Sequence, residues 1–273
     1  MPEGPEIRLA ADRLAAAVVD QPIEQLWFAN PDAAAHAPEL AESKVRAVKT
    51  KGKALLTEFD CGLTVYSHNQ LYGRWYVVKR DRWPKTGRSL RWEISTPTHS
   101  ALLYSASEIR VLDEEQLRQH PFLVKAGLDI LSDKPSEKQL LAHITQKRFR
   151  NRGLGGLLLD QGFVAGLGNY LRSEILFCSG LRPEQRIADL ADSQVETLAA
   201  QTIALCKRSY RTRGVTNDPQ IVKGLKASGL RRREYRHFVF ARAAEPCHLC
   251  GDTIEKTNVG SRRLYFCPTC QPG

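Results

Sequence analysis

Apolar positions first repeat with a helical period and then fall in short, strand-like runs. Ile7, Ala11, Leu14 and Val18 recur at three- and four-residue steps, so the pattern predicts a helix over 5–19. The next hundred residues contain short runs rich in Val, Leu, Tyr and Trp, separated by turn signals. These runs predict strands at 22–29, 44–50, 53–59, 62–68, 74–80, 88–96, 100–105 and 108–112. Short strands in regular succession indicate a sandwich or a barrel.

The pattern becomes helical in the second half of the chain. Residues 126–135 (AGLDILSDKP) are interpreted as a linker. Helices are predicted beyond it at 136–144, 154–160, 169–178 and 189–206. No internal repeat or low-complexity tract is visible. The pattern therefore indicates an α+β protein in which a β-rich half precedes a helical half.

The tetrapeptide Gly166-Leu167-Gly168-Asn169 leads directly into the third of these helices. Glycines let the backbone approach a ligand closely, and Asn is a favourable N-cap residue. The free N–H groups of a helix N-terminus bind phosphate well. The same four residues are also typical of an ordinary turn between two helices, and both interpretations stay open at this point.

Four of the seven cysteines are clustered near the C-terminus. Cys247 and Cys250 form one Cys-x2-Cys pair, Cys267 and Cys270 form another, and sixteen residues separate the two pairs. This spacing is typical of a zinc site on two knuckles joined by a β-hairpin. Four thiolates leave no open coordination position, so the predicted Zn²⁺, one per chain, is structural. The odd total of cysteines argues against a disulfide framework.

The charge of the chain favours a polyanionic partner. The 273 residues have a formal net charge of +10. Eleven Lys and Arg against two acidic residues lie between positions 207 and 242, so one segment holds nearly the whole excess. No apolar run approaches the roughly 18 residues that span a membrane. The acidic, interrupted start is unlike a signal peptide, so we expect a cytoplasmic protein.

The first six residues are Met1-Pro2-Glu3-Gly4-Pro5-Glu6. Removal of Met1 would give Pro2 a free secondary amine, and a terminal amine with a pKa near about 7.7–8.0 is partly uncharged at neutral pH. Addition of this amine to a sugar C1′ would yield a cationic iminium, which acts as an electron sink. The carboxyl of Glu3 lies beside it and could move protons. The other interpretation is a Pro/Gly-rich lead-in to a helix.

Taken together, the Pro2-Glu3 start, the β-rich half, the Gly-Leu-Gly-Asn helix and the four-cysteine finger resemble one family. This is the formamidopyrimidine-DNA glycosylase and endonuclease VIII family of base-excision repair enzymes, and the resemblance spans the whole chain. It implies an N-terminal helix with a two-layer β-sandwich, a helix–two-turn–helix domain and a zinc finger, with DNA between the halves. The expected boundaries are 1–125 for the catalytic domain, 126–135 for the linker, 136–237 for the DNA-binding domain and 238–273 for the finger.

The resemblance also implies roles for individual residues. Pro2 matches the family nucleophile, Glu3 the general acid/base, and Lys53 a lysine near the lesion phosphate. Asn169 and Arg262 match residues that bind the DNA backbone. Glu6 and Glu174 match positions that shape the pocket or the proton network.

The sequence Gln70-Leu71-Tyr72 fits the wedge that fills the base stack after a nucleotide is flipped out. It resembles the wedge of endonuclease VIII, whereas the purine-directed branch usually has a methionine-based plug. The only methionine here is Met1. The chain also lacks a lysine just ahead of Leu157-Leu158-Leu159-Asp160, where the purine branch has one. The basic stretch 215–233 matches neither branch.

The resemblance therefore implies a bifunctional DNA glycosylase and abasic-site lyase that removes oxidised pyrimidines and cuts the strand by β,δ-elimination. The expected partner is double-stranded DNA with a damaged base or an abasic site, bound by a monomer. No small-molecule cofactor is expected. One alternative is a purine-directed glycosylase with the same chemistry, and another is a non-catalytic zinc-ribbon DNA-binding protein.

Overall fold

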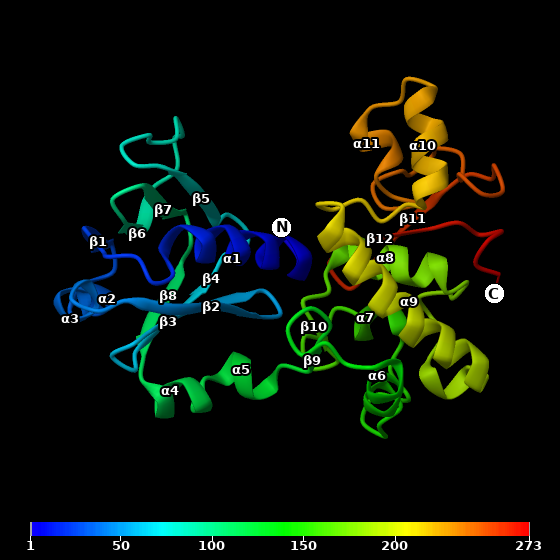
Figure 1. The fold of residues 1–273 in the computed structure, drawn as a ribbon. Coiled ribbons are helices and arrows are strands. Elements are labelled where there is room, and N and C mark those ends of the chain that lie inside the picture. The colour runs from blue at the N-terminus through cyan, green and yellow to red at the C-terminus, as the bar shows by residue number, and fades with distance from the viewer. Residues whose placement is uncertain (1, 273) are drawn as a thin grey trace. The chain divides into compact units, whose positions relative to one another are not determined.

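The computed structural model describes residues 2–272 and divides the chain into two compact units (Figure 1). Unit 1 comprises Met1–Lys125 and unit 2 comprises Ala126–Gly273. Each unit has its own hydrophobic core, as expected for a chain of this length. Among residues 2–272, no helix combines the length and the apolar character that crossing a membrane requires.

Unit 1 begins with helix α1 (Gly4–Val18) and continues with eight strands, and all eight correspond to predicted strands. The strands are β1 (Gln25–Phe28), β2 (Val45–Lys51), β3 (Ala54–Phe59), β4 (Thr64–His68), β5 (Arg74–Lys79), β6 (Leu90–Ser95), β7 (His99–Tyr104) and β8 (Glu108–Leu112). Four short helices were not predicted: α2 (Pro31–Ala34), α3 (Ala37–Ala41), α4 (Glu114–Gln119) and α5 (Pro121–Lys125). None exceeds six residues, which is too short for a helical period to be visible.

The strands form two four-stranded antiparallel sheets, in the orders β1-β6-β7-β5 and β2-β3-β4-β8. One core lies between them and includes Phe28, Trp92 and Leu103 from the first sheet and Leu55 and Val65 from the second. Helix α1 contacts strands of both sheets. The predicted helix with a two-layer sandwich is therefore confirmed.

Unit 2 contains the predicted helices and a C-terminal hairpin. The helices are α6 (Glu137–Ile144), α7 (Leu154–Leu157), α8 (Asn169–Cys178), the 3-10 helix η1 (Ile187–Asp189), α9 (Asp192–Arg211), α10 (Pro219–Ala227) and α11 (Arg232–Tyr235). The hairpin consists of β11 (Glu255–Val259) and β12 (Arg262–Phe266). Leu264 and Phe266 of β12 join the core of helices α6 to α9, so the finger packs directly on the helical domain.

The segment 126–135, expected to be a linker, is folded within unit 2. Its strand β9 (Leu128–Asp129) pairs in parallel with β10 (Val164–Ala165). Gly127 fits here because an added Cβ would lie 2.6 Å from the carbonyl oxygens of Gly162 and Phe163. A two-residue strand is too short to give a periodic pattern, so the sequence of this segment could not be distinguished from that of a linker.

Candidate active site and DNA interface

Pro2 and Glu3, the expected nucleophile and general acid/base, lie at the N-terminus of α1. Glu3 is the N-cap residue and is 4% exposed, and Pro5 lies in the first helical turn. The backbone N–H of Glu3 donates to Oε2 of Glu6, 3.0 Å away. Glu6 thus fixes the backbone that follows Pro2, a positioning contact next to the expected nucleophile. The nitrogen of Pro2 is an amide while Met1 is attached, and Met1 itself lies outside the described residues.

Lys53 lies in the turn between β2 and β3, next to the start of the wedge segment. The register pairs Ala54 with His68, the last residue of β4. Burial lowers the pKa of His68; the carboxylate of Glu108 opposes this shift and the charge of Lys53 adds to it. Lys53 and the segment that follows His68 therefore occupy the same end of this sheet. Figure 1 shows the start of α1 at that end of unit 1 as well.

The wedge loop, residues 69–73, is held by hydrogen bonds and close packing although its tip is exposed. Leu71 and Tyr72 are 55% and 69% exposed, which is unusual for large apolar side chains. Gln70 has a left-handed backbone (φ 47°), and its Oε1 accepts a hydrogen bond from Ser107 Oγ at 2.7 Å. At Gly73, an added Cβ would lie 2.5 Å from the carbonyl oxygen of Asn69. The loop therefore presents Leu71 and Tyr72 in a prepared conformation.

In unit 2, the sequence pattern predicts Asn169 as the N-cap of α8. In the structure Asn169 is instead the first residue of that helix. Gly168 occupies the cap position with an extended backbone. The preceding loop is held by Gln161, whose Nε2 donates to the carbonyl of Leu167 and whose Oε1 accepts from the N–H of Gly166. Sequence reasoning missed Gln161, because its hydrogen bonds depend on how the loop folds back.

Arg172 joins Asn169 to the finger hairpin. Its guanidinium is fully buried, and Nη2 lies 3.4 Å from Oδ1 of Asn169 and 2.8 Å from the carbonyl oxygen of Arg263. Nη1 donates to the carbonyl of Gly155 at 2.7 Å. Arg262, exposed at the start of β12, therefore lies on a strand fixed to α8. Arg172 was also missed, although an Arg three residues after Asn169 on an otherwise apolar helix face is a usable signal.

Glu174 is fully buried and accepts hydrogen bonds at both carboxylate oxygens. Oε1 accepts from the N–H groups of Val239 and Phe240, and Oε2 accepts from the N–H of Phe238 and from Thr216 Oγ1. Burial raises the pKa of Glu174, and these four donors act in the opposite direction. Burial also lowers the pKa of the neighbouring His237 well below its usual value. Glu174 thus fastens the segment leading to the finger onto α8.

We expect Glu174→Gln to lower the free energy of unfolding of unit 2 by about 2–4 kcal/mol, because an amide nitrogen would face at least one buried N–H donor. Urea denaturation of the whole chain measures this loss. Glu196→Gln, at an exposed position of α9, is the matched control and should change stability by less than about 0.5 kcal/mol. Equal stability of the two variants would contradict the anchoring role.

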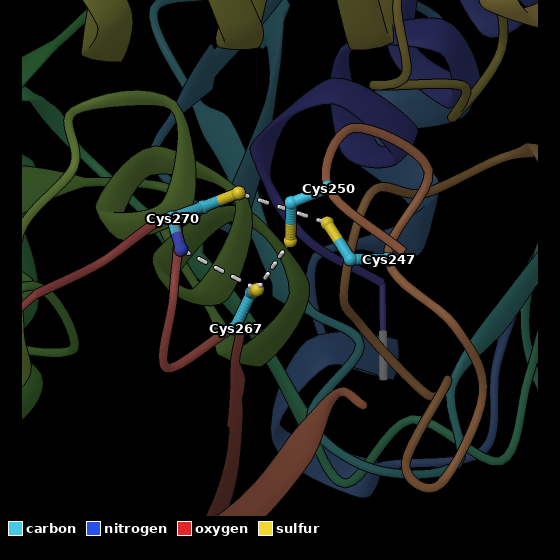
Figure 2. Close-up of side chains that lie close together, drawn as sticks. All are labelled: Cys247, Cys250, Cys267 and Cys270. Atoms are coloured by element: carbon cyan, nitrogen blue, oxygen red, sulfur yellow. Dashed lines mark hydrogen bonds between the residues drawn. The ribbon is translucent and has the colours of Figure 1, made fainter. Parts of the chain in front are cut away.

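The four cysteines near the C-terminus converge on one point (Figure 2). Their sulfur atoms all lie within 4.8 Å of one another. The Cys247–Cys270 and Cys250–Cys267 sulfur pairs are 3.8 and 3.5 Å apart. A tetrahedral zinc with Zn–S bonds of about 2.3 Å requires sulfur atoms about 3.8 Å apart. The donor set therefore fits one Zn²⁺, which would close the two knuckles and leave no position for substrate.

The basic stretch 215–233 forms helices α10 and α11, which were not predicted. Hydrogen bonds join the residues just before α10 to the end of α11. Asn217 Nδ2 donates to the carbonyl of Tyr235, and the N–H of Thr216 donates to the carbonyl of Arg236. The side chains of Lys223 and Lys226 are exposed. These helices were not predicted because Gly224, a residue unfavourable in helices, and the many cations interrupt the repeat of apolar positions.

Together, the sandwich, the glycine-led helix and the zinc finger define the class of DNA glycosylases with a zinc finger. Family models for the formamidopyrimidine-DNA glycosylase N-terminal domain, its H2TH domain and the zinc finger found in FPG and IleRS match residues 1–117, 127–219 and 244–273. The chain belongs to the formamidopyrimidine-DNA glycosylase and endonuclease VIII family, whose members are DNA glycosylases with abasic-site lyase activity. The expected enzyme class and the structural zinc are thereby confirmed.

Two relatives named Endonuclease 8 illustrate the similarity. The protein from Klebsiella pneumoniae subsp. pneumoniae is 46% identical over 271 residues, which is 99% of this chain and all of the relative. One from Escherichia coli is also 46% identical over the same lengths. Among solved structures, a Lactococcus lactis Fpg complex with abasic-site DNA has a TM-score of 0.79 at 21% identity. A MutM complex with carbocyclic 8-oxo-G DNA has a TM-score of 0.80 at 21% identity. These two structures share the fold.

Proposed function

We propose that this bifunctional DNA glycosylase of base excision repair acts on oxidised pyrimidines in double-stranded DNA through an iminium formed by Pro2. The observation that supports this most directly is the grouping, at one end of unit 1, of the α1 N-terminus, Lys53 and the wedge loop. The full-length similarity to proteins named Endonuclease 8 supports the choice of pyrimidines. We place the enzyme in the cytoplasm, with the DNA, as a monomer.

In the proposed reaction, the Pro2 nitrogen bonds to C1′ of the flipped nucleotide while the glycosidic bond breaks and its electron pair leaves with the base. The bonded nitrogen loses its proton, the C1′–O4′ bond breaks, and O4′ takes a proton from Glu3 while the nitrogen lone pair forms the C1′ iminium. The resulting iminium withdraws electrons, so a proton is lost from C2′ and the C3′–O bond breaks. Loss of a proton from C4′ then drives a second elimination, which breaks the C5′–O bond. The departing oxygens leave as phosphate ends on both sides of a one-nucleotide gap.

The remaining residues bind and position the DNA. Leu71 and Tyr72 would fill the vacated stack, at a site where flipping costs a few kcal/mol. Gln70 would hold the wedge loop in place, because its side chain accepts a hydrogen bond from Ser107. Lys53, Asn169 and Arg262 would contact phosphates, Asn169 and Arg262 as a pair placed by Arg172. We retain residues 1–125 as the catalytic domain, 136–237 as the DNA-binding domain and 238–273 as the finger.

A panel of duplexes tests the substrate assignment. Purified protein whose N-terminus is verified as Pro2 by mass spectrometry is given duplexes with thymine glycol, dihydrouracil or 8-oxoguanine. We expect faster excision of the two pyrimidines and a covalent adduct after borohydride reduction. A strong preference for 8-oxoguanine would overturn the assignment, and the absence of any adduct would overturn the iminium mechanism.

Replacing Glu3 is expected to separate the two activities. Glu3→Gln removes the acid that opens the sugar ring, so excision of thymine glycol should slow by about 10²-fold or more. Cleavage of a pre-formed abasic site should slow much less, because an abasic sugar is in equilibrium with its open-chain aldehyde, which forms the iminium without that proton. Single-turnover rates on both substrates measure the difference. Glu42→Gln, at an exposed position after α3, should leave both rates unchanged. Equal losses of both activities in Glu3→Gln would contradict the role.

A further inference from the structure

The positive charge of unit 1 is concentrated in one segment. Residues 1–125 contain seventeen Lys and Arg and sixteen Asp and Glu, so this unit is nearly neutral. Seven of these cations but only one acid, Asp81, lie between residues 74 and 91. The rest of unit 1 holds ten cations and fifteen acids, so this segment is a basic region on an otherwise acidic unit.

The centre of this region is the connection from β5 to β6, residues 80–89, here called the basic crossover. Strands β5 and β6 both pair with β7, and Lys79 lies opposite His99 whereas Leu90 lies opposite Tyr104. The basic crossover must therefore return along the whole length of β7. Arg80 is paired with Glu24 and Asp81. Arg82 and Lys85 are exposed, and within residues 2–272 no carboxylate forms an ion pair with either.

The basic crossover ends against the wedge loop. Arg88 Nη1 donates a hydrogen bond to the backbone carbonyl of Tyr72. The carbonyl oxygen of the neighbouring Ser89 accepts a hydrogen bond from the N–H of Ser105, 2.8 Å away. Ser105 directly follows β7, the strand that pairs with β5, so the end of the basic crossover is bonded to the end of β7. The basic crossover and the wedge loop are therefore hydrogen-bonded neighbours on the surface of unit 1.

The same surface exposes large apolar groups. Trp83 in the basic crossover is 50% exposed, and Leu71 and Tyr72 lie in the wedge loop. These three are half of the large hydrophobic side chains that are exposed among the described residues. Exposed aromatic groups among unpaired cations suit nucleic acid, which offers phosphates to the cations and flat bases and sugars to the rings.

We propose that the basic crossover is a second DNA contact of unit 1, which binds backbone phosphates of the duplex beside the wedge through Arg82 and Lys85. Trp83 lies against the sugar-phosphate backbone in this complex. The inference rests on the proposed function, because it takes the wedge loop to enter DNA. Phosphate contacts position a protein without reading sequence, so this one strengthens binding to damaged and undamaged duplexes alike.

The test is the salt dependence of binding by Arg82→Gln/Lys85→Gln, with Arg88 kept so that the wedge loop is undisturbed. Two lost phosphate contacts should reduce the slope of log K against log [salt] by about 1.8 and weaken binding at 0.1 M salt by roughly ten- to sixty-fold. The probes are a duplex with a stable abasic-site analogue and the same duplex undamaged, and the ratio of the two affinities should stay constant. Binding should also change the fluorescence of the parent more than that of Trp83→Phe.

The matched control is Arg46→Gln/Arg118→Gln, which removes two exposed cations elsewhere in unit 1 and should keep the parent slope. Thermal melting verifies that every variant is folded. A slope for Arg82→Gln/Lys85→Gln equal to that of the parent overturns the inference, as does an equal decrease in the control. If the parent itself neither cleaves damaged DNA nor is trapped on it, the proposed function fails instead, so the two failures are distinguishable.

Discussion

Insertion of one alanine between Met1 and Pro2 is expected to abolish covalent trapping on abasic-site DNA and to slow strand cleavage by roughly 10³-fold or more. Removal of the initiator then leaves an alanine amine at the terminus and keeps the Pro2 nitrogen in an amide. An amide nitrogen shares its electron pair with the carbonyl and cannot attack C1′. The new amine is displaced by one residue from the position that Glu3 and Glu6 fix.

The insertion should leave DNA binding intact. Affinity for a duplex with a stable abasic-site analogue should stay within about threefold of the parent, because each phosphate contact proposed here lies outside the first helix. Borohydride trapping and binding are measured on the same preparations, with the N-terminus of each verified by mass spectrometry. A chain with an acylated Pro2 that still forms the adduct would show that another amine is the nucleophile.

The β-rich half was predictable because its strands lie in a two-sided sandwich. Such a sandwich uses short strands joined by tight turns, so each strand leaves a short run rich in Val, Leu, Tyr and Trp that ends at a turn signal, as at Asp60-Cys61-Gly62 between β3 and β4. Alternation is weak, because β3, β4, β6 and β7 are buried along most of their length. The four cysteines were predictable for another reason, since their ligand spacing is set by the metal and not by the rest of the fold.

The missed features depend on contacts between distant segments. Arg172 acts through the carbonyls of Gly155 and Arg263, seventeen and ninety-one residues away, and Ser107 acts on Gln70 across thirty-seven residues. A single sequence has no local sign of such pairs. The placement of Asn169 differed by one position, because Gly168 adopts the extended cap conformation and leaves the Asn side chain for Arg172.

Contacts within each unit hold the wedge loop, Asn169 and the finger strand in one conformation. The left-handed backbone of Gln70 has a local cost of order 1–3 kcal/mol, and it is held by Ser107, Arg88 and the close approach at Gly73. In the proposed complex, a loop prepared in this way would lose less conformational entropy on entering DNA. Arg172 has the same effect for Asn169 and the finger strand.

Loss of the metal ligand Cys250 is expected to weaken DNA binding by more than about 10²-fold. Without zinc, the knuckles have only a small core around Phe238, Ile254 and Tyr265, and apparent zinc-binding free energies of about 10–16 kcal/mol are typical of such fingers. Hairpin β11–β12 would then lose its fixed place, and with it Arg262 and the backbone carbonyls that Arg172 holds. The proposed phosphate contacts of Asn169 and Arg262, which Arg172 places as a pair, would then be lost together.

Cys250→Ala is compared with Cys61→Ala, which removes an exposed cysteine from unit 1 and should keep full zinc content and full binding. Zinc content by atomic absorption and affinity for abasic-analogue DNA are measured on both variants. Chelated parent protein should behave like Cys250→Ala, since each loses the same metal. Full DNA affinity in a preparation shown to be free of zinc would mean that unit 1 and the α8 N-terminus suffice. In that case Arg262 would not be a phosphate ligand, and buried Arg172 would serve the helical core alone.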